Sequence, residues 1–290
     1  MSKTLPIITA SLGIAALASG AVVWHDMHRF VIRRYEVYSG KIGKDRRIVL
    51  LSDLHDQIYG RHNERLLEAI SEIAPDMVLS AGDLITAHHN PEKQRGEEST
   101  ALLMTLARRY TLIAANGNHE TKIDRRRELY DDRYDDYEAF VHSAGGMILR
   151  NESVKIPGER VQVAGLELPL SYYKHFVKKP LSVAQLNEWL GRPDPENYNI
   201  MIAHHPDYFE VYRAWGADLV LSGHIHGGIV RLPWIGGVVS PTARLFPHYD
   251  GGRYDEEGST LILSRGLGTH SIPIRFLNPG ELVVIDVKAR

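Results

Sequence analysis

Residues 47–55 read Arg-Ile-Val-Leu-Leu-Ser-Asp-Leu-His, an apolar run that ends in an aspartate and a histidine two positions apart. A short apolar run with polar ends is typical of a strand buried inside a sheet, so we predict a strand over Arg47–Ser52. Asp53 and His55 then lie where that strand ends. Because open α/β sheets build their sites at strand ends, this stretch indicates both the fold class and the place of a functional site.

The segments that follow alternate between helix and strand. Apolar residues at helical spacing predict helices over Asn63–Ile73 and Gly96–Arg108, and an apolar stripe at positions 130, 134, 137 and 141 predicts a third. Further strands are predicted over Met77–Ser80, Thr111–Ala115, Ser153–Ile156, Val161–Leu166, Tyr198–Ile202, Leu219–Ser222, Leu261–Ser264 and Glu281–Val287. Early alternation followed by many strands favours an α/β sandwich of packed sheets over a barrel. We expect a four-layer αββα sandwich, with two packed mixed sheets flanked by helices.

Five polar clusters each follow one of the predicted strands. They are Asp53-Leu54-His55, Gly82-Asp83, Gly117-Asn118-His119-Glu120, His204-His205-Pro206 and Gly223-His224-Ile225-His226-Gly227-Gly228. In an extended backbone the two members of Asp-x-His, and likewise of His-x-His, would point to one side and reach a common ion. Imidazole, carboxylate and amide oxygen donors suit manganese, iron, zinc or magnesium better than copper or an iron–sulfur cluster.

In this order, the five clusters resemble the signature of the calcineurin-like metallophosphoesterases. Three further stretches resemble the YkuE-like branch of that family: Arg150–Ser153 (RNES), Val230–Gly236 (VRLPWIG) and Ser264–Phe276 (SRGLGTHSIPIRF). The resemblance covers roughly residues 30–290. Ile229 departs from it, because this branch commonly has a glutamine after His-Gly-Gly, and the departure bears on substrate preference.

The resemblance implies a centre of two divalent metal ions. One ion would be held by Asp53, His55 and His226, the other by Asn118, His204 and His224, and Asp83 would bridge them. Manganese is the expected metal, with zinc, iron and magnesium as alternatives. His119 would be the catalytic residue, donating to the leaving oxygen or stabilising equatorial charge, and Glu120 would orient its imidazole. The expected substrate contacts are His205, Arg265 and His270.

Composition and charge exclude several other classes. The chain contains no cysteine, so disulfides and thiolate metal sites are excluded. The formal net charge of −2 is uneven: residues 1–50 carry eight Lys or Arg and three Asp or Glu, and the remainder carries 26 basic and 33 acidic residues. An acidic catalytic portion argues against binding along a nucleic-acid backbone. A basic excess beside an apolar segment favours attraction to anionic lipid.

The apolar segment Leu5–Trp24 holds no charged residue, and about 20 apolar residues are what a helix needs to cross a bilayer. We therefore expect an N-terminal transmembrane helix, with a cleaved signal peptide or a buried soluble helix as alternatives. The basic residues that follow favour a cytoplasmic catalytic domain, and export is the alternative. The expected division is 1–25 as anchor or signal segment, 26–46 as a basic juxtamembrane segment with the first strand, and 47–290 as the catalytic domain.

Together these features predict a metal-dependent hydrolase of a phosphate ester or pyrophosphate. The anchor favours a membrane-associated substrate, such as a lipid precursor resembling UDP-diacylglucosamine. One alternative is a soluble nucleotide phosphodiesterase that is merely tethered to the membrane. Another is a degenerate family member that keeps the fold as a binding module. Every expected ligand position is filled, which argues against degeneration.

Overall fold

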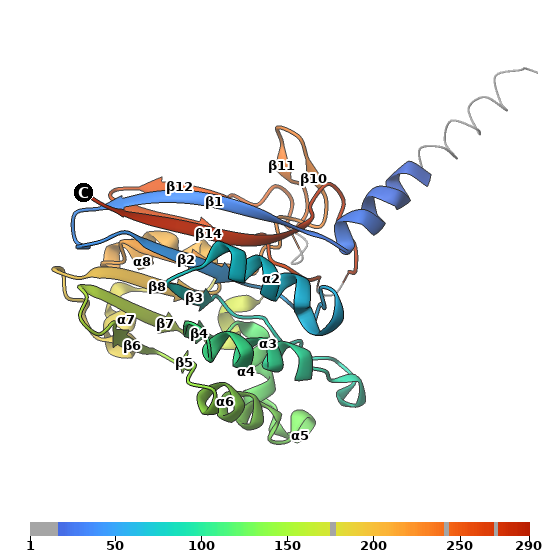
Figure 1. The fold of residues 1–290 in the computed structure, drawn as a ribbon, viewed down its shortest axis with the longest axis horizontal. Helices are drawn as coiled ribbons and strands as arrows, with labels where there is room; N and C mark the ends of the chain where they lie inside the picture. The colour runs from blue at the N-terminus through green and yellow to red at the C-terminus, as the bar shows by residue number, and fades with distance from the viewer. Residues whose placement is uncertain (1–16, 175–177, 241–243, 270–271) are drawn as a thin grey trace, which may run out of the picture.

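The structure of the chain, a computed structural model, describes residues 17–174, 178–240, 244–269 and 272–290. Within these residues two six-stranded sheets pack face to face, and helices cover both outer faces (Figure 1). A two-stranded hairpin, β10 (Arg231–Leu232) with β11 (Gly236–Gly237), is separate from the two large sheets. The described part of the chain is therefore layered as helix, sheet, sheet, helix.

The first sheet has the strand order β1-β14-β2-β3-β4-β5. Its strands are β1 (Phe30–Ser39), β14 (Gly280–Ala289), β2 (Arg46–Leu51), β3 (Met77–Ser80), β4 (Thr111–Ala115) and β5 (Met147–Leu149). β14 runs parallel to β1 and antiparallel to β2, while β2 through β5 run parallel to one another. β3 is buried along its whole length, as a parallel strand covered on both faces requires.

The second sheet has the strand order β12-β13-β9-β8-β7-β6. Its strands are β12 (Gly252–Glu256), β13 (Ser259–Leu263), β9 (Leu219–Ser222), β8 (Tyr198–Ala203), β7 (Val161–Leu166) and β6 (Glu152–Lys155). The four central strands are parallel, and the two edge strands are antiparallel to their neighbours. Side chains from both sheets form one core between them, including Leu50 and Ile113 of the first sheet and Val163 and Ile202 of the second.

Helices complete the two outer layers. The first sheet is covered by α2 (Glu64–Ile73), α3 (Glu97–Ala107), α4 (Asn118–Arg125), α5 (Arg127–Tyr130) and α6 (Arg133–Ser143). The second sheet is covered by α7 (Val183–Leu190) and α8 (Phe209–Trp215). Short 3-10 turns are η1 (Arg61–Asn63), η2 (Pro91–Lys93), η3 (Leu170–Tyr173) and η4 (Pro206–Tyr208). The predicted tyrosine stripe is buried, but Tyr130 belongs to α5 and its other members to α6, because the chain turns at Asp131 with a φ of 52°.

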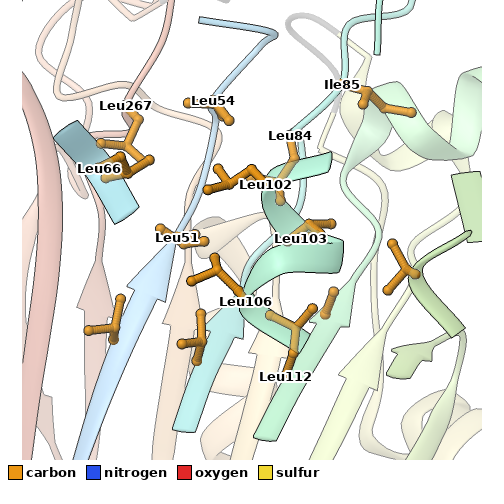
Figure 2. Packing of buried hydrophobic residues seen from close by; sticks show 14 of the residues in the cluster. Leu51, Leu54, Leu66, Leu84, Ile85, Leu102, Leu103, Leu106, Leu112 and Leu267 are labelled. Atoms are coloured by element: carbon orange, nitrogen blue, oxygen red, sulfur yellow. The ribbon is translucent and has the colours of Figure 1, made fainter. Parts of the chain in front are cut away.

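Leucines next to the predicted ligands anchor the loops at the ends of β2 and β3. Leu54 follows Asp53 and Leu84 follows Asp83, and both leucines are fully buried. Figure 2 shows them in the core that α3 covers, where Leu84 lies beside Leu102. Burying a leucine side chain stabilises a fold by about 1.5–3 kcal/mol. Burial of Leu54 and Leu84 in the core therefore fixes the loops that carry Asp53 and Asp83.

The expected N-terminal transmembrane helix is wrong for the residues that the structure describes. None of their helices is both long enough and apolar enough to cross a membrane. Residues 17–27, which include the end of the predicted span, are helical. The rest of the predicted span, residues 5–16, lies outside the described residues. The membrane-associated location inferred from this helix is corrected with it, and the division into domains stays a prediction.

Candidate metal centre

The five polar clusters lie at the carboxyl ends of five strands. In the first sheet Asp53 follows β2, Asp83 follows β3, and Asn118 begins α4 after β4. In the second sheet His204 follows β8 and His224 follows β9. Parallel strands direct their carboxyl ends to the same edge of a sheet. The clusters of the two packed sheets therefore meet at one edge of the sandwich.

Several of these residues have a left-handed backbone conformation instead of the extended one that their spacing suggested. The φ angles are 50° for Asp53, 49° for His55, 54° for Asp83, 74° for His224 and 55° for His226. Such conformations cost about 1–3 kcal/mol each and gather at functional sites, where the surrounding structure enforces them. The side chains converge because the chain turns sharply after each strand. The alternation of side chains along an extended strand does not bring them together.

The turn before His224 is crowded in a way that only glycine tolerates. A Cβ atom on Gly223 would lie 1.9 Å from Ser52 Oγ and 2.2 Å from Asp53 Oδ2. The backbone N–H of His224 donates to both carboxylate oxygens of Asp53, at 2.9 and 3.1 Å. The Ser52 hydroxyl donates to the same carboxylate. Asp53 thus joins the loop after β2 to the loop after β9.

The donor atoms of Asp53, His55 and His226 converge in a first group. The Nε2 atoms of His55 and His226 are 3.2 Å apart, and Nε2 of His226 is 3.3 Å from Asp53 Oδ1. On its other side, Nδ1 of His226 lies 3.3 Å from the carbonyl oxygen of Gly268. A hydrogen bond at one ring nitrogen directs the other toward the group. Two imidazoles and a carboxylate arranged in this way could hold a divalent cation.

Asp83, His204 and His224 form a second group. Nε2 of His204 is 3.1 Å from Asp83 Oδ2, and its Nδ1–H donates to the carbonyl oxygen of Ala81 at 2.7 Å. That bond directs Nε2 of His204 into the site. Asp83 Oδ2 is also 3.8 Å from Nε2 of His55, which belongs to the first group. Asp83 therefore lies between the two groups.

Two buried atoms of the site that could bind a metal ion have no hydrogen bond to any other described residue. They are Oδ1 of Asn118 and Nε2 of His204, which lies near Asp83 without the geometry of a hydrogen bond. A buried polar atom left without a hydrogen bond costs about 1–3 kcal/mol, so these two atoms point to a ligand. Amide oxygen and imidazole nitrogen both bind manganese, iron, zinc and magnesium. The residues present therefore fit a pair of divalent cations.

The electrostatics of the site favour cations. Burial raises the pKa of Asp53 to about 6, although the charge of His204 opposes this. Burial also acts to raise the pKa of Asp83, but nearby positive charge, that of His204 first, outweighs it and holds the pKa well below its usual range. Burial lowers the pKa of His204, but the carboxylates of Asp83 and Asp53 outweigh it and raise that pKa to about 9. A potential negative enough to hold a proton on a buried imidazole also attracts a metal ion.

His119 lies beside the group at Asp83 with a defined tautomer. The backbone N–H of Ala87 donates to Nδ1 of His119 at 2.8 Å. A ring that accepts a hydrogen bond at Nδ1 carries its hydrogen on Nε2. Nε2 of His119 is 4.0 Å from Asp83 Oδ2. His119, Asp83 and His55 together form a further group whose side-chain nitrogen and oxygen atoms converge. The Nε2–H of His119 is thus on the side of the ring that faces Asp83 and His55.

Glu120 holds the backbone of the site, a different task from the predicted orientation of His119. Its buried carboxylate accepts hydrogen bonds of 2.8 to 3.2 Å from the backbone N–H groups of Asp83, Leu84, Ile85 and Gly117. Burial, with the charge of Asp83, raises the pKa of Glu120 to about 7. Glu120 therefore ties the loop after β3 to the start of α4.

The three predicted substrate contacts have different surroundings. His205 packs against His224, with ring centroids 4.7 Å apart, so it borders the second group. Nε of Arg265 is 3.4 Å from the carboxylate of Glu281, a fully buried residue at the start of β14. The guanidinium of Arg265 is therefore engaged in an ion pair. His270 lies outside the described residues.

Three residues near the site were missed in the sequence. The ring of Tyr173 lies 5.1 Å from that of His224 and 6.0 Å from that of His204. Asn278 and Arg275 hold the backbone around His226 through hydrogen bonds to carbonyl groups. Arg275 stands in a stretch that resembles the YkuE-like branch, which was the only signal for it. Tyr173 and Asn278 carry no motif that could have singled them out.

Comparison with known proteins identifies the family. The family model for calcineurin-like phosphoesterases matches residues 46–228, more than half of the 290-residue chain. The chain therefore belongs to the calcineurin-like phosphoesterase family, whose members are metal-dependent hydrolases of phosphate esters. The resemblance inferred from the motifs is confirmed by this match.

Relatives include an uncharacterized metallophosphoesterase of Helicobacter pylori, 28% identical over 259 residues that cover 88% of this chain and 63% of the relative. The chain thus spans less than two thirds of that relative. The uncharacterized metallophosphoesterase YkuE of Bacillus subtilis is 25% identical over 263 residues, 84% of this chain and 79% of its own. The solved structure of the NAD nucleotidase of Haemophilus influenzae is 12% identical, covers 77% of this chain and 50% of its own, and has a TM-score of 0.47, too low to carry an argument.

Proposed function

We propose that this chain is a binuclear metal-dependent phosphoesterase that hydrolyses a small phosphate ester or phosphoanhydride. The observation that carries the proposal is the position of Asp83 between two convergent donor groups. A carboxylate shared by two sets of imidazoles suits a pair of cations better than a single one. The family of the chain supports the same chemistry.

In this proposal the ligands divide between two ions. One ion takes Asp53, His55 and His226, the other takes Asn118, His204 and His224, and Asp83 bridges them. Bound together, two divalent ions supply an activated water near neutral pH and positive charge for the phosphoryl oxygens. Both aspartates are buried, so solvent screens their negative charge less than it would at the surface. Manganese is the metal we propose first.

The proposed task of His119 is to donate a hydrogen bond to a phosphoryl or leaving-group oxygen. Its Nδ1 already accepts the N–H of Ala87, so the hydrogen of the neutral ring is on Nε2. A doubly protonated ring would carry a hydrogen on Nδ1 as well and would lose that bond. We therefore favour a neutral donor that stabilises charge over a full proton donor.

The proposed substrate is a small phosphate-containing molecule. A lipid-linked substrate was expected only because of the predicted membrane anchor, and no described helix can serve as that anchor. His205 and Tyr173 border the second group and would contact the substrate beyond the phosphate.

The test is a substrate panel on metal-stripped protein supplied separately with Mn²⁺, Zn²⁺, Fe²⁺ or Mg²⁺. The panel contains a nitrophenyl phosphate monoester, a bis(nitrophenyl) diester, nucleotide pyrophosphates and a lipid-linked sugar diphosphate in micelles. We expect metal-dependent turnover of at least one soluble ester, with about two ions bound per chain. Two bound ions without turnover of any substrate would instead support the binding-module alternative.

A further inference from the structure

Asn278 holds the turn that carries His226. Its side chain is fully buried, and its Nδ2 donates to the carbonyl oxygens of His226 and Gly228, both at 2.7 Å. One amide group therefore holds both ends of the turn from 226 to 228. His226 and Gly227 in this turn have positive φ angles of 55° and 71°. A turn in this conformation needs such external support to persist.

Arg275 fixes the carbonyl group that faces the ring of His226. Its buried guanidinium donates to the carbonyl oxygens of Gly268, Gly266 and Asn278. The oxygen of Gly268 is the one that lies 3.3 Å from Nδ1 of His226. Arg275 thus positions the partner of the imidazole, while Asn278 positions the backbone of the same residue.

Asp26 connects this framework to the first described helix. It belongs to the helical residues 17–27 but is buried, and its Oδ2 accepts the backbone N–H of Asn278 at 2.9 Å. Its Oδ1 pairs with Arg29 at 3.2 Å. The carbonyl of Arg29 in turn accepts the N–H of Gly280 at 3.2 Å. Two bonds therefore hold the segment around Asn278 against the start of the chain's first strand.

We propose that Asn278, held by Asp26 and Arg275, is a positioning residue for His226 and sets the affinity of the ion that His226 would bind. The helix over residues 17–27 acts on the metal centre through this connection. The inference rests on the proposed metal centre and deepens it. Asp26, Arg275 and Asn278 all lie outside the residues 46–228 that the family model matches. Groups that orient ligands in this way change metal affinity by about 10–100-fold when removed.

The test measures Mn²⁺ binding to the full metal-stripped chain by calorimetric titration. Asn278→Ala should weaken one of the two ions by about 10–100-fold and leave the other unchanged. Asp26→Ala should produce a smaller loss at the same ion, because it removes one support of Asn278 and leaves its side-chain bonds. Asp26→Asn should restore wild-type affinity, since an amide oxygen can accept the same N–H.

A matched control is Asp45→Ala. Asp45 also accepts a backbone N–H from the segment containing β14, that of Ala289 at 3.0 Å, and pairs with Lys288, but it does so at the opposite end of the strand. This variant should bind both ions as the wild type does. Equal weakening of both ions by Asn278→Ala, or a loss of thermal stability with unchanged binding, would overturn the positioning role.

A second measurement keeps the inference separate from the proposed function. Hydrogen–deuterium exchange of the segment 224–232 in metal-free protein reports the turn directly, because the N–H of Gly228 is bonded to the carbonyl of Ile225 at 3.0 Å. Asn278→Ala should speed exchange in this segment, and Asp45→Ala should not. If the wild type bound no metal, the proposed function would fail. Unchanged exchange in Asn278→Ala would contradict the positioning role of Asn278, whether or not the wild type binds metal.

Discussion

The backbone N–H of Ala87 donates to Nδ1 of His119 across 2.8 Å, so the loop that carries Asp83 also determines which nitrogen of the imidazole faces the site. Ala87 lies in the segment after Asp83 and is itself buried. The bond leaves Nε2–H as the donor and disfavours a second hydrogen on the ring. It therefore separates two roles that the sequence left open for His119.

Replacing His119 with Ala should lower kcat by about 10²–10³-fold and leave two ions bound, because the ring donates a hydrogen bond to developing charge. The loss should be similar for phosphate esters with good and with poor leaving groups. The measurement is kcat over a series of aryl phosphate esters, with metal content determined in parallel. A loss that shrinks steeply for good leaving groups would show proton transfer instead, and loss of one ion would make His119 a ligand.

Replacing Asp83 with Asn should lower the affinity for both ions and abolish turnover. Asp83 is the carboxylate between the two groups, so its neutralisation removes charge from both. Metal content after dialysis and activity in excess metal check this expectation. Asp131→Asn, at an exposed helix end, is the control and should behave as the wild type. Normal turnover of Asp83→Asn with two ions bound would remove the bridging assignment.

Replacing Gly223 with Ala should destabilise the fold and weaken metal binding together. The new methyl group would overlap Ser52 Oγ and Asp53 Oδ2, and overpacking of this kind costs about 1–3 kcal/mol or more. Gly43→Ala is the matched control, because a Cβ there meets nothing within 4 Å. Thermal melts and metal titrations of the two variants provide the comparison. Normal metal binding by Gly223→Ala would show that Asp53 does not need the observed position.

Adding metal to the stripped protein should raise its melting temperature. Ligands that bind only the folded state at 100 times their Kd stabilise it by about 2.7 kcal/mol, which for a chain of 290 residues corresponds to about 4–5 °C. Calorimetry with and without Mn²⁺ measures the shift. Asp83→Asn should show much less of it. Identical melting of the stripped and supplied wild type would contradict a metal centre built from buried carboxylates.

Much of the sheet architecture is readable from short apolar runs. β3 and β9 begin and end where the sequence predicts, because both are buried on both faces and are bounded by polar residues or glycine. The N-terminal segment was misread because its apolar run was taken as a membrane span. The described part of that run is a mostly exposed stretch of the helix over residues 17–27, and no described helix is both long and apolar enough to cross a membrane. An apolar run alone does not show what surrounds it.

The candidate site was partly predictable because its residues follow strands in a recognisable order. The local geometry was not, since the two-residue spacing of Asp53 and His55 was read as extended backbone, whereas both have positive φ. The support from Asn278 could not be foreseen either. Its contacts with His226 join positions far apart in the chain through one amide group, and no periodic pattern records such a contact.

The position of β14 between β1 and β2 has a consequence for synthesis. These two strands lie in the first 51 residues, yet β1 has no neighbour in the sheet and β2 has none on that side until the strand spanning Gly280–Ala289 lies between them. A nascent chain therefore exposes the unpaired edges of β1 and β2 until residues 280–289 have left the ribosome, and its first sheet closes only then. Pairing across so long a sequence separation is slow, and unpaired strand edges favour aggregation, so we expect the nascent chain to need protection until this sheet closes.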